Sequence, residues 1–160
     1  MTTTMEASSG AAPDLRALLE RVEATFKPSK ELDRLIARQF GWHRVEPRVG
    51  GGMRGGWIAP EDFMGVDSRG APLLDSLHGT DIHREVPHFT ASIDAALALV
   101  EREMPEDTWG LLNEAMFDAT VKYKGAISAP LPRALLAALL KAKIANSPQE
   151  AKSGLQGGEG

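Results

Sequence analysis

The segment from Val86 to Glu101, VPHFTASIDAALALVE, constrains the fold more than any other part of the chain. Pro87 favours extended backbone at the residue before it, and the hydroxyl groups of Thr90 and Ser92 can cap the start of a helix. Apolar residues then recur at helical spacing, at Ile93, Ala96, Leu97, Val100 and Met104. The pattern predicts an amphipathic helix that packs its apolar stripe on a sheet and ends at Pro105.

Three further helices are predicted from the same kind of signal. Leucine and valine residues recur every three or four positions after Asp14, which predicts a first helix. Ser29 can cap a second helix, and Gly41 can end it in a left-handed conformation. Pro132 suits the first turn of a last helix, whose leucine- and alanine-rich face extends to about Asn146.

Short extended segments are predicted between these helices. Residues 42–46 contain aromatic and β-branched side chains and are followed by Pro47, which predicts a strand. A segment around Trp109 and Leu111 can pair as a hairpin with the alternating apolar residues that follow, Phe117, Ala119, Val121 and Tyr123. We therefore predict an α+β fold, a three-stranded antiparallel sheet with helices packed against it, in the order α-β-α-β-β-α.

Length and composition predict one domain between two polar arms. A chain of 160 residues, with 42% hydrophobic and 25% charged residues, is large enough for a substantial core. We expect a single domain over residues 13–145 and disordered arms at 1–12 and 146–160, where almost nothing can be buried. Residues 47–87 carry many glycines and prolines and predict one long irregular loop, although Trp57 and Ile58 can add a short extended segment.

Charge and cysteine content exclude several classes of function. The net charge is −4, from 18 basic and 22 acidic residues without a dense basic stripe, which argues against nucleic-acid binding. The chain has no cysteine, so disulfides, thiolate catalysis and cysteine metal sites are excluded, as fits a reducing cytoplasm. No apolar run approaches the ~20 residues of a membrane helix, and no secretory signal is present. We expect a cytoplasmic protein without a membrane partner.

Two groups of residues are candidate sites. Four side chains from one region can in principle hold a metal ion, namely His78, Asp81, His83 and His88. Their spacing matches no known ligand pattern, and solvated loop histidines are the simpler interpretation. The glycine-rich run 50–56 can wrap a phosphate, with Arg54 as counter-charge and Trp57 as a stacking surface. It lacks the lysine and hydroxyl of a P-loop, so a flexible turn is the alternative.

Several blocks of the chain resemble the phage ABA sandwich domain family. The similar blocks are ELDRLIARQFGW, GGWIAPEDF, PHFTASIDAALALV and LPRALLAALLKAK, which together span roughly Lys30 to Lys143. The chain departs from the family in a long insertion from Asp67 to Glu85 and in few aromatic residues around the predicted hairpin. The resemblance implies a phage or prophage origin and supplies neither an activity nor catalytic residues.

These observations predict a non-enzymatic accessory protein that binds a host protein or a small ligand and needs no cofactor. An anti-defence or host-modulating role follows by analogy with other small viral proteins. Arg54, Trp57 and Phe63 are the expected contact residues. One alternative is a metal-dependent hydrolase built on the loop histidines, and another is a structural or assembly component of a phage particle. A homo-oligomer is compatible with all three, because apolar helix faces can pair symmetrically.

Overall fold

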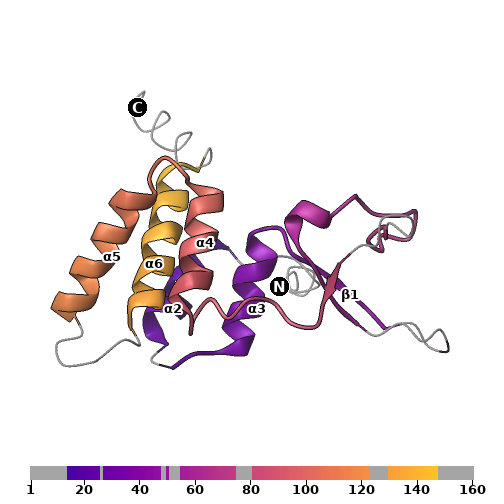
Figure 1. The fold of residues 1–160 in the computed structure, drawn as a ribbon, viewed down its shortest axis with the longest axis horizontal. Coiled ribbons are helices and arrows are strands. Elements are labelled where there is room, and N and C mark those ends of the chain that lie inside the picture. The colour runs from indigo at the N-terminus through magenta and orange to yellow at the C-terminus, as the bar shows by residue number, and fades with distance from the viewer. Residues whose placement is uncertain are drawn as a thin grey trace, which may run out of the picture. The chain divides into compact units, whose positions relative to one another are not determined.

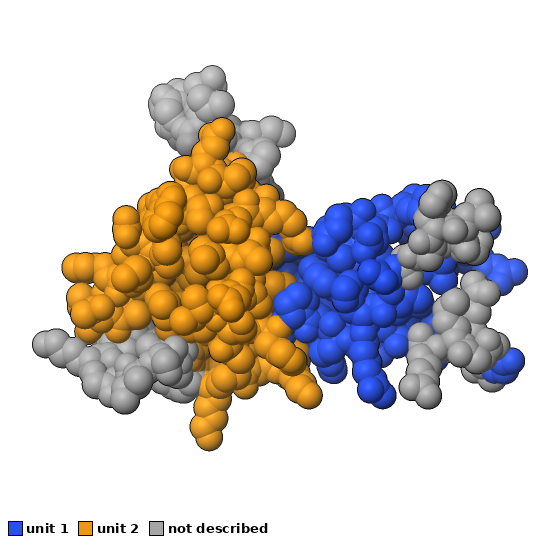
Figure 2. Space-filling view, in the orientation of Figure 1, with its two compact units in different colours: residues 1–12, 33–87 blue, residues 13–32, 88–160 orange. Residues whose placement is uncertain are grey.

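The computed structural model describes residues 14–25, 27–47, 50, 55–74, 81–122 and 130–147. Within them, five α-helices, one short 3-10 helix and three strands follow the order α2, α3, β1, β2, η1, β3, α4, α5, α6. They divide into two compact units (Figure 2): unit 1 is residues 1–12 and 33–87, and unit 2 is residues 13–32 and 88–160. The predicted arm 1–12 and nearly all of 146–160 lie outside the described residues, and the single domain over 13–145 stays a prediction.

Unit 2 is built around α6 (Pro130–Ala145). Every residue from Pro132 to Leu140 is buried, and all of them except Arg133 are apolar, so this part of the helix has apolar side chains on nearly all sides. It contacts α2 (Leu15–Ala24), α4 (Ile93–Glu103) and α5 (Thr108–Lys122), and Figure 1 shows these helices gathered beside it. A helix that is apolar all round is stable in water only when neighbours cover it, and α6 is covered in this way.

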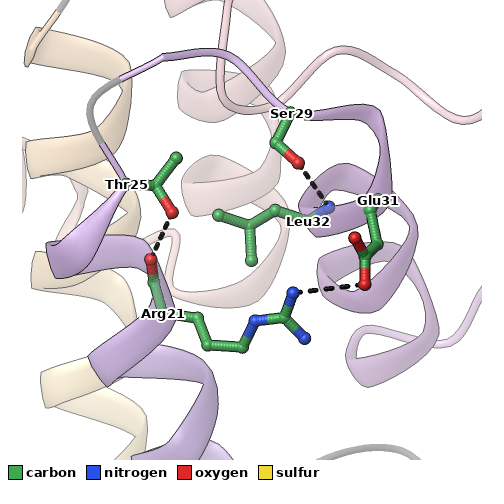
Figure 3. Close-up of polar contacts among 5 residues, drawn as sticks. All are labelled: Arg21, Thr25, Ser29, Glu31 and Leu32. Carbon is green, nitrogen blue, oxygen red and sulfur yellow. Dashed lines mark hydrogen bonds and ion pairs between the residues drawn. The ribbon is translucent and has the colours of Figure 1, made fainter.

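Local hydrogen bonds define the connection between α2 and α3 (Lys30–Gln39), as Figure 3 shows. The Thr25 hydroxyl donates to the carbonyl oxygen of Arg21 at 2.5 Å, and the Ser29 hydroxyl oxygen accepts from the amide of Leu32 at 3.2 Å. Arg21 also pairs with Glu31 at 3.3 Å, an exposed ion pair that adds little stability. The predicted cap of the second helix at Ser29 is confirmed.

The segment that leads into α4 is held by two hydroxyl groups. The Ser92 side chain accepts a hydrogen bond from the amide of Ala95 at 3.2 Å, which confirms it as the cap of α4. The Thr90 side chain is 1% exposed, and its Oγ1 accepts from the amide of Ser29 at 2.9 Å. Thr90 therefore joins the residues before α4 to those before α3.

Unit 1 contains the sheet. Strands β1 (His43–Val45), β2 (Gly56–Ile58) and β3 (Ile82–His83) pair antiparallel in the order β1-β2-β3, with His43 opposite Ile58 and Trp57 opposite His83. The buried apolar side chains of the unit come from α3, the sheet and the residues beside them: Ile36, Ala37, Phe40, Trp42, Val45, Trp57, Ile58, Ala59 and Val86. Gly41 has φ +95°, which confirms the left-handed end predicted for α3.

The α+β class with a small three-stranded antiparallel sheet is confirmed, but the predicted order of elements is wrong. Strand β3 and the 3-10 helix η1 (Pro60–Asp62) lie within 47–87, where a long irregular loop was expected, whereas β2 confirms the short extended segment predicted there at Trp57 and Ile58. The predicted hairpin at 109–123 is helix α5 over its described part. Leu111 and Ala115, four residues apart, are buried where α5 packs on α6, and Leu, Ala, Met and Glu favour helix. The alternation of apolar and polar residues after Phe117 is short, and the packing of α5 on α6 outweighs it.

The buried face of α4 also differs from the predicted stripe. Ala96, Leu99 and Val100 are buried, whereas Ile93 is 38% exposed and Leu97 is half-buried. The reason is that α4 contacts α5 and α6, so the partner of its apolar face is helical and not the predicted hairpin. The prediction of a helix ending before Pro105 is confirmed, as is the burial of Ala96 and Val100, while the stripe is wrong in including the exposed Ile93 and omitting the buried Leu99.

Candidate binding surfaces

The histidines proposed as metal ligands do not assemble a site in the described part of the chain. His78 lies outside the described residues, while Asp81, His83 and His88 are all exposed. Among the residues that the structure describes, no group of three acidic or histidine side chains is close enough to hold a metal ion. The His83 ring instead packs edge-on against Trp42, with ring centroids 5.3 Å apart. This contact gives His83 a place in the packing of unit 1.

Trp57 is part of the core of unit 1 and is not an accessible stacking surface. Its side chain is 2% exposed, and the guanidinium carbons of Arg38 and Arg44 lie 5.6 and 5.8 Å from its ring centroid. Two cations of the chain itself therefore contact the ring that was expected to stack on a ligand. Arg54, the expected counter-charge, lies outside the described residues.

The last two glycines of the run 50–56 have a structural explanation. A Cβ on Gly56 would lie 2.6 Å from the carbonyl oxygen of His83, and one on Gly55 would lie 2.9 Å from the Pro47 side chain. Both positions need glycine because neighbouring backbone and ring atoms approach closely. Phosphate binding is not required to account for them.

Phe63, the third predicted contact residue, is half-buried and packs on the sheet. Its ring stacks on His43 with a centroid distance of 3.5 Å and an interplanar angle of 16°. Burial of the imidazole lowers the pKa of His43 and favours its neutral form. Phe63 thus anchors the start of the residues that follow it, and these are far more exposed.

Residues 64–74 form a narrow excursion with a hydrogen-bonded tip. Val66 pairs with Pro72, and the amide of Leu73 donates to the carbonyl oxygen of Gly65 at 2.9 Å. At the tip, the Asp67 carboxylate accepts from the amides of residues 69 and 71 at 2.8 and 3.0 Å. Three large apolar side chains on it are exposed, Met64 at 59%, Val66 at 53% and Leu73 at 43%, with Arg69 exposed at the tip. We call Met64, Val66, Leu73 and Arg69 the loop surface.

A second apolar surface lies on α5 in unit 2. Trp109 is 77% exposed, Phe117 67%, Val121 54% and Met116 51%, and we call these four residues the α5 face. A cavity of about 230 Å³ adjoins it, lined by Leu97, Glu101, Pro105, Thr108, Trp109 and Leu112. Sequence reasoning missed this surface because it assigned these residues to a hairpin. The available signal was the presence of apolar residues on every side of a helical projection of 108–122.

Comparisons with protein-family profiles, with curated proteins and with solved structures find no match to this chain. The phage ABA sandwich resemblance therefore rests on the quoted sequence blocks alone. No helix in the described ranges combines the length and apolar character needed to cross a membrane. The loop surface and the α5 face are the features from which a function can be argued.

Proposed function

We propose that this protein is a non-enzymatic binding protein of phage or prophage origin that contacts a host protein through the loop surface. The observation that carries the proposal is the excursion 64–74, which presents Met64, Val66 and Leu73 to solvent from a hydrogen-bonded hairpin. Large apolar side chains that gather on an exposed segment are typical of protein-binding sites. The matching partner has an apolar depression with a carboxylate beside it for Arg69.

The construction of the hairpin supports a role in recognition. Binding orders side chains and loops at a cost in free energy, and a segment that is already held in one conformation incurs less of it. The two hydrogen bonds to the Asp67 carboxylate hold the tip of this excursion before any partner arrives. The stack of Phe63 on His43 anchors the start of the excursion to the sheet.

The proposed origin comes from the sequence resemblance, and the proposed setting is the interior of the host cell. By analogy with other small viral proteins, binding of the host protein masks a host defence or modulates the host in another way. Within this proposal Phe63 supports the loop surface and Trp57 supports the sheet beneath it. Arg54 stays a predicted contact residue.

In-cell photo-crosslinking tests the proposal. A photoreactive amino acid is placed at Val66, and a matched control is placed at Glu20, an exposed position of α2 in unit 2. We expect a host protein to be crosslinked from position 66 and not from position 20, with its identity given by mass spectrometry. A crosslink to a coat or tail protein would instead support the alternative of a particle component.

Binding of the captured partner is then measured with purified proteins. We expect the double substitution Met64→Ser and Val66→Ser to weaken binding at least ~30-fold, as for hot-spot residues, because it removes the apolar contacts and leaves the hairpin hydrogen bonds in place. Ala98→Ser, at an exposed position of α4, is the control and should leave the dissociation constant unchanged. Equal crosslinking from positions 66 and 20, or equal binding by both variants, would refute the proposal.

A further inference from the structure

The cavity of about 230 Å³ beside α5 lies wholly within unit 2, between the end of α4 and the start of α5. Its lining residues come from both helices and their connection: Leu97, Glu101, Pro105, Thr108, Trp109 and Leu112. Most of these side chains are apolar or aromatic, and the two polar ones belong to Glu101 and Thr108. A concave apolar site with a few placed polar groups is the usual form of a small-molecule site, and the polar groups decide which ligand fits.

The Glu101 carboxylate is available to a ligand. It is exposed, and none of the residues that the structure describes pairs with it. The residues three and four positions away on the helix surface are uncharged. The nearby Arg102 and Lys143 pair with Glu103 instead, at 3.4 and 3.1 Å. Glu101 also lies in the last turn of α4, at the negative end of the helix dipole, where a cation is favoured. The charge at the cavity therefore favours a cationic ligand.

The Thr108 hydroxyl group adds a hydrogen-bond acceptor to the cavity. Its Oγ1 donates to the carbonyl oxygens of Met104 and Pro105, at 3.1 and 3.3 Å. A hydroxyl group has a single hydrogen and two lone pairs, so this oxygen can only accept from a ligand. Both polar groups of the cavity are thus acceptors, and the ligand must supply donors. An ammonium group is a cation that carries N–H donors.

The volume of the cavity and the exposed Trp109 ring indicate an apolar body behind the ammonium group. At about 30 Å³ for each water molecule, the cavity has room for roughly eight non-hydrogen atoms. A lysine side chain, with its four-carbon stem, fills only part of that volume. Trp109 is 77% exposed, so its indole ring can pack on an apolar ligand and can also attract a cation through its face.

We propose that this cavity binds a small organic amine, in which a primary ammonium group is carried on an aromatic or aliphatic body of about the size of a phenethyl group. The ammonium group lies between the Glu101 carboxylate and the Thr108 hydroxyl oxygen. The apolar body packs on Leu97 and Leu112, and the Trp109 ring covers it. The loop surface belongs to unit 1, so amine binding does not depend on the proposed contact with a host protein.

A titration of the whole protein with phenethylamine, followed by nuclear magnetic resonance, tests the site. Trp109 is the exposed tryptophan of unit 2, whereas Trp42 and Trp57 are 8% and 2% exposed in unit 1. We expect the indole N–H signal of Trp109 to shift with added amine and the signals of the other two to stay in place. The variant Trp109→Phe assigns the signal that shifts.

Two analogues of the probe separate charge from hydrogen bonding. 2-Phenylethanol has the same shape without the charge and should bind at least ~10-fold more weakly, since it loses the hydrogen bond to a charged partner. The trimethylated phenethylammonium ion keeps the charge but has no N–H donor, and it should also bind at least ~10-fold more weakly. Equal binding of either analogue would overturn the assignment of a primary ammonium group.

Two glutamine substitutions locate the binding carboxylate. Glu101→Gln should raise the dissociation constant of phenethylamine at least ~10-fold, because it removes the negative charge and keeps the size of the side chain. Glu106→Gln is the matched control, since Glu106 is exposed close by but does not line the cavity, and it should leave the dissociation constant unchanged. Trp109→Ala should raise the dissociation constant about 3-fold, as expected for loss of an exposed cation–π contact.

Three results would overturn the proposal: no shift of the Trp109 signal at millimolar amine, equal dissociation constants for the two glutamine variants, or a preference for a lysine side chain. The last is tested with Nα-acetyl-lysinamide, whose tighter binding would assign the cavity to a protein partner. Crosslinking from position 66 tests the loop surface separately, so either proposal can fail without the other.

Discussion

The orientation of α4 can be tested by comparing two truncations on the same helix, Leu99→Ala and Ile93→Ala. Leu99 is 3% exposed and Ile93 is 38% exposed, although the sequence pattern placed Ile93 in the apolar stripe and left Leu99 out of it. Each substitution removes three carbon atoms, which is worth about 2.4 kcal/mol when the side chain is fully buried. The comparison therefore separates the observed helix orientation from the predicted one.

For Leu99→Ala, the cavity left beside α6 should raise the loss of unfolding free energy to about 3 kcal/mol. For Ile93→Ala, partial exposure reduces the transfer contribution to about 1.5 kcal/mol, and no closed cavity forms. Alanine favours the helix more than isoleucine does and offsets a few tenths of a kcal/mol, so the net loss of unfolding free energy is about 1 kcal/mol.

Urea unfolding followed by far-ultraviolet circular dichroism measures both variants against the wild type at one protein concentration. We expect the midpoint to fall clearly further for Leu99→Ala, with similar slopes for all three proteins. Equal losses, or a larger loss for Ile93→Ala, would mean that α4 presents the periodic stripe to its neighbours and that the described packing of unit 2 is incorrect.

Substitutions at two further positions, Thr90 in unit 2 and His43 in unit 1, test one polar side chain of each unit. Thr90→Val should lower the free energy of unfolding, measured with urea, by about 1–3 kcal/mol, because it leaves the amide of Ser29 without its acceptor. Thr90→Ser keeps the hydroxyl and should keep most of the stability. Equal losses for the two variants would contradict the role of the hydroxyl. Burial lowers the pKa of His43 in the folded state, so the unfolded chain binds more protons at this residue. The contribution of His43 to stability is therefore retained above its unfolded pKa of about 6.5 and is lost as the pH falls below it. His43→Phe should flatten the decline of the melting temperature between pH 7 and pH 5, and an unchanged slope would show that this histidine is not responsible.

Local signals in the sequence predicted the helices that have distinct caps or apolar faces. Ser29 and Ser92 cap their helices as expected, and Gly41 ends α3 in a left-handed conformation. These features depend on hydrogen bonds and dihedral preferences within a few residues, so they can be recognised without knowledge of the rest of the fold.

The sheet was predicted in number of strands, in pairing direction and in the location of β1 and of the Trp57–Ile58 segment, but its third strand was placed in the hairpin after Trp109 instead of at Ile82–His83. Strand β3 contains two residues, both exposed, and β2 follows a glycine-rich run, so neither has a clear period-two pattern. Their pairing depends on Gly56, where the backbone of His83 approaches too closely for a side chain. A close approach between residues so far apart in sequence leaves little trace in either segment alone.

The candidate sites were predicted less well than the fold, because exposure decides them. Trp57 has the residue type of a binding anchor but lies in the core, with Arg38 and Arg44 near its ring. Trp109 has the same residue type and is 77% exposed. Residue type and spacing do not distinguish these two tryptophans, and only the position of their neighbours does.

The sequence by itself determined where most helices begin and end, and it determined the α+β class, since capping and apolar periodicity act over a few residues. Tertiary structure decided that residues 108–122 are helical, which face of α4 is buried and which large apolar side chains stay in water. The physical reason is that apolar burial depends on surfaces brought together from distant parts of the chain. For α4 and α5 that surface is helix α6, which is buried from Pro132 to Leu140.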